Sequence, residues 1–384
     1  MDGRTDVTGV AANAAVYAER EQRIAAAVAL EKPDRVPIVY QGEAFSAVYS
    51  GVGTARYCND DAAPVEAHVK TLEGLGGYDA LNSVVGGRIG PLLSSAWLTR
   101  VRVPGRELPD GVVWQVDEAA PVMAVEGYDR ILAEGWGPVY ESLLAEVVDM
   151  EELGGTLAWL EENTAATIQT FRDLGYPIMS SGGIVTPFES LCGARTMAQF
   201  YMDLYRRPDV VKAAMDAILP DTIAFGVGAA QASGVQCTWI GGWRSSSGML
   251  SETQWLEFVL PHVKLIAEAL VEGSITPILH FDHDWTRALP HLRELPAQKC
   301  ILMTDGMTDI RAAKEILGGH MAVMGDVPPT LLATGTPEDV RTYVRDLVRD
   351  VGPDGFLLSP GCDAPVNAKP ENMQALCDAG HEFG

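Results

Sequence analysis

The chain has 384 residues, of which 52 are acidic, 28 are basic and 47% are hydrophobic, and its formal net charge is −24. So negative a surface repels nucleic-acid phosphates and anionic lipid headgroups, so we expect neither nucleic acid nor a membrane surface as a partner. No apolar stretch reaches the roughly 18 residues that a membrane-spanning helix needs. The composition is that of a soluble, acidic globular protein.

Cysteine usage and the first segment of the chain indicate a cytoplasmic protein. The six cysteines are scattered and form no CxxC pair, and the first twenty residues, MDGRTDVTGVAANAAVYAER, contain no apolar core resembling a signal peptide. We therefore expect reduced thiols.

The chain begins with a predicted helix over residues 14–31, after which short apolar or β-branched runs alternate with amphipathic segments such as 251–272. Eight runs read as strands: 36–40, 80–85, 177–181, 237–240, 275–281, 300–304, 321–325 and 355–359. Eight strands with intervening helices predict a (β/α)8 TIM barrel, and no GxGxxG motif follows the first strand to favour a doubly wound sheet. We expect a single domain over residues 1–384.

One segment does not fit the alternation. Residues 86–136 carry alternating Trp97, Val101 and Val103, then a Pro-Gly pair and the apolar run 112–116. This pattern predicts a β-rich insertion in the second βα unit, covering one end of the barrel.

Because active sites of such barrels form at the C-terminal strand ends, the residues just after each run are the candidates. His280, Asp282 and Cys362 together offer an imidazole, a carboxylate and a thiolate, which suits a zinc site with an open fourth position. The alternative is a hydrogen-bonded His and Asp at the barrel mouth and a small buried cysteine. Other candidates are Glu43 and Asp305 as catalytic carboxylates and Asn82, Trp243, Arg244 and Trp285 as substrate-binding residues.

Two of these candidates have an equally ordinary interpretation. The aromatic residues near strand ends could line a pocket for a flat substrate or simply anchor loops and core. Arg244 could bind a substrate carboxylate, or it could pair with a neighbouring Asp or Glu in so acidic a protein.

Four long blocks resemble the uroporphyrinogen decarboxylase superfamily: GGIVTPFESLCGARTMAQFYMDLYRRPDVV (182–211), LSETQWLEFVLPHVKLI (250–266), GDVPPTLLATGTPEDV (325–340) and GFLLSPGCDAPVNAKPEN (355–372). The opening RIAAAVALEKPDRVPI is similar to that superfamily's first helix and strand. The resemblance runs from about residue 20 to the end of the chain and implies a barrel enzyme.

The resemblance also distinguishes branches of the superfamily. Its decarboxylases carry Arg-Gln-Ala-Gly-Arg-Tyr after the first strand to grip substrate carboxylates, whereas this chain has YQGEA at 40–44. Its zinc methyltransferases carry a His-x-Cys on the fifth strand, which falls on His280 and Asp282, and a late cysteine, which falls on Cys362. An oxygen ligand in place of a thiolate leaves the ion harder and more Lewis-acidic, which suits an ether or phenolate oxygen.

The methyltransferase branch therefore implies a Zn²⁺-dependent enzyme that moves a methyl group from a small, methoxylated aromatic donor to cob(I)alamin. The chain has no Asp-x-His-x-x-Gly cobalamin signature, so the corrinoid would be carried by a separate partner protein. Three alternatives stay open: a cofactor-free decarboxylase, a metal-dependent epoxide:thiol transferase, and a metal-free scaffold subunit.

Overall fold

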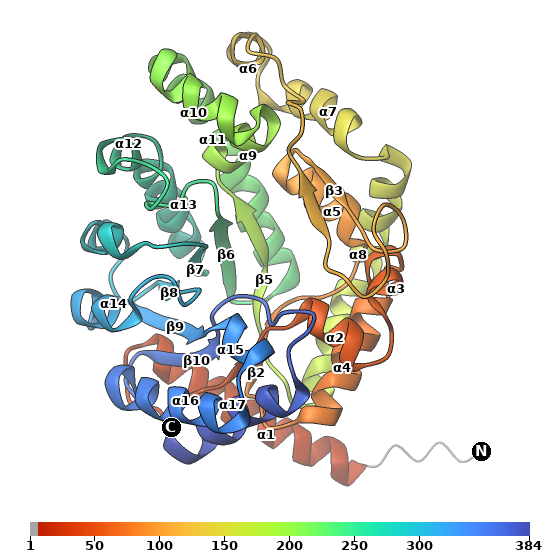
Figure 1. The fold of residues 1–384 in the computed structure, drawn as a ribbon, viewed down its shortest axis with the longest axis vertical. Helices are drawn as coiled ribbons and strands as arrows, with labels where there is room; N and C mark the ends of the chain where they lie inside the picture. Colours follow the sequence, from red (N-terminus) through yellow and green to blue (C-terminus); the bar gives the residue numbers. More distant parts are fainter. Residues whose placement is uncertain (1–6) are drawn as a thin grey trace.

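Eight parallel strands form one sheet in the computed structural model, which describes residues 7–384. Their order is β1-β2-β5-β6-β7-β8-β9-β10. A parallel bridge between Ile38 and Leu358 and a 2.9 Å hydrogen bond from Leu358 N to Pro37 O join β10 back to β1. The helices surround this barrel (Figure 1), so the predicted (β/α)8 architecture is confirmed. Residues 1–6, part of the segment examined for a signal peptide, lie outside the described residues.

All eight predicted runs coincide with barrel strands. The strands are β1 (Val39–Tyr40), β2 (Ala80–Ser83), β5 (Ile178–Val185), β6 (Cys237–Gly242), β7 (Thr276–Phe281), β8 (Ile301–Met303), β9 (Ala322–Val327) and β10 (Phe356–Pro360). The largest difference is in β5, which was expected to end at residue 181. It continues because a register shift between Ser180 and Gly183 absorbs an irregularity at Gly182, whose φ of 138° is open to glycine.

The helices follow the strands in chain order. They are α1 (Val7–Val28), α2 (Glu43–Tyr49), α3 (Thr54–Asn59), α4 (Ala63–Leu75), α5 (Ile89–Trp97), α6 (Gly127–Glu134), α7 (Trp136–Val147), α8 (Met150–Asp173), α9 (Pro187–Arg195), α10 (Met197–Arg206), α11 (Pro208–Ser233), α12 (Glu252–Phe258), α13 (Leu260–Glu272), the 3₁₀ helix η1 (Thr286–Glu294), α14 (Ile310–Leu317), α15 (Pro329–Thr334), α16 (Pro337–Val351) and α17 (Pro370–Phe383).

The amphipathic segment 251–272 is two helices rather than one. A capping box between Ser251 and Gln254 begins α12. The helix ends before Val259, and α13 begins with Pro261 in its first turn. Proline lacks an N–H to continue the first helix but fits the first turn of the next, so the break lies where the sequence has its proline.

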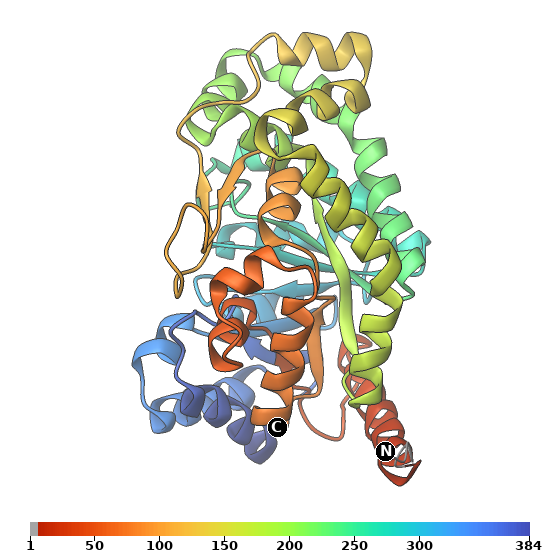
Figure 2. The same cartoon turned by 90° about the vertical axis from the view of Figure 1, so that its right-hand side faces the viewer.

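The insertion contains the predicted hairpin, but helices flank it. Strands β3 (Arg100–Arg102) and β4 (Gln115–Asp117) pair antiparallel. Before them lies α5 and after them α6, so the segment is less β-rich than expected. Helix α5 turns one face inward, where Gly90, Pro91 and Ser94 are buried. Figures 1 and 2 place the insertion on the side of the molecule away from α1.

Helix α1 packs against one end of the barrel interior. Ala27 belongs to the same buried apolar cluster as the inward-facing strand residues Val39, Ala80 and Ile278. An ion cluster fastens the helix: the buried Asp79 carboxylate accepts hydrogen bonds from Arg23 at 2.8 Å and from Arg35 at 2.6 Å. Because α1 covers this end, the carboxyl ends of the strands are left for a functional site.

The prediction of reduced thiols agrees with the structure, in which all six cysteines are free. Among residues 7–384, no helix is long and apolar enough to cross a membrane.

Candidate metal centre

Three side chains with metal-binding atoms meet at the carboxyl end of the barrel. His280 lies on β7, Asp282 directly follows that strand, and Cys362 follows β10. One nitrogen, one oxygen and one sulfur atom of these residues all lie within 4.8 Å of one another. His280 and Asp282 are two residues apart, a spacing that turns both side chains to the same face of an extended chain. Closure of the barrel brings Cys362 to them across 80 residues of sequence.

Two of the distances between these atoms fit a tetrahedral zinc ion. Asp282 Oδ1 lies 3.5 Å from His280 Nε2 and 3.5 Å from Cys362 Sγ. Zinc bonds of about 2.0–2.3 Å at tetrahedral angles separate neighbouring ligand atoms by roughly 3.3–3.7 Å. Three protein ligands also leave one position for substrate, as in catalytic rather than structural zinc sites.

Burial governs the charge of the site. Burial raises the pKa of the Cys362 thiol well above its usual range, and the carboxylates of Asp282 and Asp363 raise it further. Burial also acts to raise the pKa of Asp282, but the hydrogen bond and charge of His280 outweigh it and lower that pKa. His280 is 5% exposed, and its buried Nδ1 has no hydrogen-bond partner within residues 7–384. Metal binding would therefore release the thiol proton of Cys362. The positive charge of the ion would then balance the negative charges of the thiolate and of Asp282.

A pair of partly buried carboxyl groups, those of Glu43 and Asp363, lies next to these ligands. Glu43 begins α2, and its backbone N–H donates to Asp363 Oδ1 at 2.7 Å, while Ala44 N donates to Oδ2 at 3.3 Å. Burial and the Asp363 charge raise the pKa of Glu43 well above its usual range, and burial raises the pKa of Asp363 to about 6. The raised pKa favours the protonated form of Glu43, and in that form the group can donate a proton. Sequence reasoning proposed Glu43 but assigned no role to Asp363, although its place beside Cys362 was visible.

Asp305 organises the loops around the centre. Its carboxylate accepts hydrogen bonds from the backbone N–H groups of His283 at 2.7 Å and Met307 at 2.8 Å. It thereby ties the loop after β7 to the loop after β8. The geometry gives Asp305 a positioning role and does not place it in the ligand cluster.

Arg244 has the more ordinary of its two interpretations. Its guanidinium is fully buried and lies 2.7 Å from Glu118 Oε1 and 3.5 Å from Glu189 Oε2. The same group lies 4.0 Å above the ring of Trp243, which itself packs edge-on against Trp97. Arg244 and Trp243, two of the predicted substrate-binding residues, therefore join the barrel to its insertion in this structure.

Trp285 is buried next to the site and holds its backbone. Its ring is 2% exposed and packs edge-on against Trp255. Its indole N–H donates to the backbone oxygen of Asp282 at 3.2 Å. The residue therefore holds the strand end that carries two candidate ligands.

Asn82 lies inside the barrel and connects several strands. It donates to Gln41 Oε1 at 2.6 Å and accepts from Trp239 Nε1 at 3.3 Å. The Trp239 ring lies 5.0 Å from the ring of His280. Sequence reasoning proposed Asn82 but missed Trp239 and gave Gln41 no role, because only the closed barrel shows that these side chains meet.

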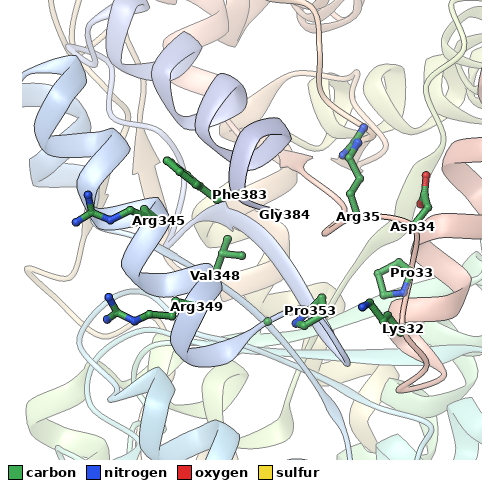
Figure 3. Close-up of a pocket in the computed structure, with 11 residues that line it drawn as sticks. Lys32, Pro33, Asp34, Arg35, Arg345, Val348, Arg349, Pro353, Phe383 and Gly384 are labelled. Atoms are coloured by element: carbon green, nitrogen blue, oxygen red, sulfur yellow. The ribbon is translucent and has the colours of Figure 1, made fainter.

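The cavity in Figure 3, with a volume of about 530 Å³, lies away from the candidate metal centre. Its wall carries Arg35, Arg345 and Arg349, each of which is already paired with a carboxylate. The guanidinium charges are therefore compensated, and nothing in the lining matches the chemistry of the His280 cluster.

Comparison with known proteins shows which family the chain belongs to. The sequence model of the family described as "Uroporphyrinogen decarboxylase (URO-D)" matches residues 118–383. Uroporphyrinogen decarboxylase of Trichlorobacter lovleyi is 25% identical over 259 residues, which cover 64% of this chain and 73% of the relative. The enzyme of the same name from Neisseria meningitidis serogroup B is 26% identical over 275 residues, which cover 67% of this chain and 74% of the relative.

A solved structure shares the whole fold. A methyltransferase from Methanosarcina mazei superposes with a TM-score of 0.68 over 95% of this chain and 98% of its own, at 17% identity. That likeness shows a common architecture.

Proposed function

This chain belongs to the uroporphyrinogen decarboxylase family, and from that premise we propose that it is a metal-dependent methyltransferase rather than a decarboxylase. The observation that carries the proposal is the cluster of His280, Asp282 and Cys362, whose nitrogen, oxygen and sulfur atoms lie within 4.8 Å of one another and can serve as three zinc ligands. A cofactor-free decarboxylase has no use for a thiol, an imidazole and a carboxylate converging at the barrel mouth.

The proposed reaction transfers a methyl group from a small methoxylated aromatic compound to cob(I)alamin on a separate corrinoid protein. The partner's corrinoid would supply the electron pair for the new bond to carbon, and the electrons of the broken carbon–oxygen bond would stay on the oxygen. Zinc held by the three side chains would supply Lewis-acid polarisation of that ether oxygen. Glu43, whose pKa is raised by burial and by the charge of Asp363, would donate the proton that the leaving oxygen needs.

Uroporphyrinogen decarboxylation is the second candidate, because the curated relatives carry that name. Against it stands the segment YQGEA at 40–44, which has no arginine where the decarboxylases that the chain resembles carry two to grip substrate carboxylates. The acidic Glu43 at this place and a net charge of −24 disfavour a polycarboxylate substrate.

Metal analysis of purified protein tests the proposal directly. We expect about one zinc per chain by mass spectrometry, with loss in both His280→Ala and Cys362→Ala. The zinc-loaded protein should then demethylate a methoxylated aromatic such as 2-methoxyphenol when cob(I)alamin is supplied, and should leave uroporphyrinogen III unchanged. Absence of metal after incubation with zinc at neutral pH would refute the methyltransferase proposal, and turnover of uroporphyrinogen III would favour the decarboxylase.

A further inference from the structure

Three hydrogen-bonding side chains form a line across the interior of the barrel. Trp239 Nε1 lies 3.3 Å from Asn82 Oδ1, and Asn82 Nδ2 lies 2.6 Å from Gln41 Oε1. They come from β6, from β2 and from the residue after β1. Asn82 is 2% exposed and Gln41 is 6% exposed, so neither amide can turn freely towards water.

The chemistry of tryptophan sets the direction of this line. An indole N–H can only donate a hydrogen bond, so the oxygen of Asn82 must face Trp239. The Asn82 amide nitrogen must then face Gln41, and the Gln41 oxygen must accept from it. The polarity follows from donor and acceptor capacities and does not depend on distinguishing oxygen from nitrogen at either amide.

This polarity determines what Gln41 can offer to a ligand. Its side-chain oxygen accepts from Asn82, so only its NH₂ group is free to form a further hydrogen bond. Within residues 7–384, Gln41 Nε2 has no hydrogen-bond partner. This nitrogen is accessible to solvent, since it is not one of the buried polar atoms that lack a partner. The backbone of Gln41 is held in place because its carbonyl accepts from Ala364 N at 3.2 Å. The free amide group therefore belongs to a residue fixed both through its side chain and through its backbone.

This donor lies in the same part of the barrel as the candidate metal centre. The Trp239 ring that starts the line is 5.0 Å from the His280 ring. Asn82 Nδ2 also lies 3.8 Å from Met303 Sδ, and Met303 pairs with His280 in the sheet. A ligand at the mouth of the barrel would meet the amide and the metal-binding side chains together.

We propose that Gln41 is a substrate-binding residue whose amide is locked by Asn82 and Trp239 so that it presents only a hydrogen-bond donor to the ligand. The site then selects a compound with an acceptor oxygen, such as a ketone or a second ether, at that point. This rests on the proposed function and narrows it: the methoxylated aromatic donor carries a further acceptor oxygen besides the one that leaves. A compound with only N–H groups there would leave Gln41 unpaired and bind more weakly.

Two small neutral compounds test the inference without knowledge of the natural substrate. Acetophenone offers only an acceptor, and aniline offers chiefly donors. Their affinities can be titrated through the ¹⁵N–¹H signal of the Trp239 indole, which is identified by its absence in Trp239→Phe. Zinc content is measured on every sample, so a failure of the metal proposal is seen separately from a failure of this one.

Two variants separate the donor from the lock that aims it. Gln41→Met removes the donor and keeps a side chain of similar size and shape, so the ratio of acetophenone to aniline affinity should fall about tenfold. Asn82→Asp has no N–H to give, so Gln41 must turn and donate to it, which presents the Gln41 oxygen outward. In this variant the preference should reverse towards aniline. Gln236→Met, at an exposed position before β6, serves as the control and should leave the ratio unchanged.

The inference is overturned if the wild-type protein shows no preference for acetophenone, if neither compound shifts the Trp239 signal, or if Asn82→Asp keeps the wild-type ratio. A reversed preference in Asn82→Asp has no explanation in a purely structural role, because a packing defect would weaken both compounds alike.

Discussion

At the scale of single residues, Asp282 determines what kind of metal site this barrel can hold. It provides the only oxygen among the three candidate ligand atoms, and an oxygen ligand makes the ion a stronger Lewis acid than a second thiolate would. Its place between His280 Nε2 and Cys362 Sγ, 3.5 Å from each, makes its charge central to the cluster.

We predict that Asp282→Asn lowers zinc affinity by more than about tenfold, since even loss of an outer hydrogen-bond partner costs 10- to 100-fold. The amide keeps the shape of the side chain but removes its charge. Competition with a chromophoric chelator measures the change. Asp284→Asn, which removes the same charge from an exposed position two residues away, should bind zinc as the wild type does. Equal affinity of all three proteins would exclude Asp282 as a ligand.

A second buried carboxyl group makes stability depend on pH. Asp326 is 3% exposed at the end of β9, and burial raises its pKa to about 7, although a hydrogen bond from Tyr343 acts to lower it. The pKa in the folded chain thus exceeds that in the unfolded chain, so the folded state binds more protons between about pH 4 and pH 7. This contribution to stability is complete below about pH 4 and is lost as the pH rises through 7.

Asp326→Asn should therefore be more stable than the wild type at pH 8.5, by up to about 4 kcal/mol, and similar to it near pH 4. Urea unfolding at both pH values measures the difference. Tyr343→Phe provides the opposite control: without its 2.8 Å hydrogen bond to Asp326 Oδ1, the pKa of Asp326 should rise and the loss of stability with pH should steepen. An unchanged pH dependence in both variants would contradict the assignment.

At the scale of elements, helix α1 is part of the barrel rather than an appendage. It is joined to the sheet by the buried Asp79, which accepts from Arg23, Arg35 and the backbone N–H of Ile38. We predict that Asp79→Asn lowers the free energy of unfolding by about 3–5 kcal/mol, because the buried guanidinium of Arg23 and the partly buried one of Arg35 lose their common counter-charge. Denaturant titration measures the loss. In Asp34→Asn, where the carboxylate paired with Arg23 is 65% exposed, the loss should stay below about 1 kcal/mol.

The insertion is fastened to the barrel by Arg244. Glu118, just beyond β4, accepts from Arg244 Nε at 2.8 Å, and the same guanidinium faces Glu189 on α9. We predict that Glu118→Gln speeds backbone hydrogen exchange in residues 100–123 about tenfold, as expected for loss of a charged hydrogen bond worth about 1.5 kcal/mol. Exchange in β7 and β9 should not change. Glu126→Gln, an exposed neighbour, is the control, and equal exchange in both variants would argue against such a fastening.

At the scale of the whole molecule, the net charge of −24 works against the compact state. Added salt screens this repulsion, so raising sodium chloride from about 10 to 200 mM at neutral pH should raise the thermal midpoint by about 2 °C or more. The same addition near pH 4.6, the isoelectric point, should have little effect because net repulsion is then absent. A similar rise at both pH values would point to preferential exclusion of salt instead.

The barrel and its strands could be read from the sequence because apolar β-branched runs, helix caps and their alternation are local signals. Local signals failed where a tertiary contact overrode them: β5 runs through two glycines because a neighbouring strand pairs beyond its bulge. The insertion became partly helical because α5 has a face to bury. Segment 251–272, in contrast, broke at Pro261, a signal that was present but outweighed by the amphipathic pattern.

The amino-acid sequence by itself determined the fold class, the family and the three candidate metal-binding residues, since these depend on periodic patterns and ordered motifs. Only the tertiary structure decided which side chains meet. It paired Arg244 with Glu118 and Glu189, coupled Glu43 to Asp363, and joined Trp239 through Asn82 to Gln41. The physical reason is that burial and hydrogen-bond partnership are set by residues far apart in the chain, which closure of the barrel brings within 4 Å.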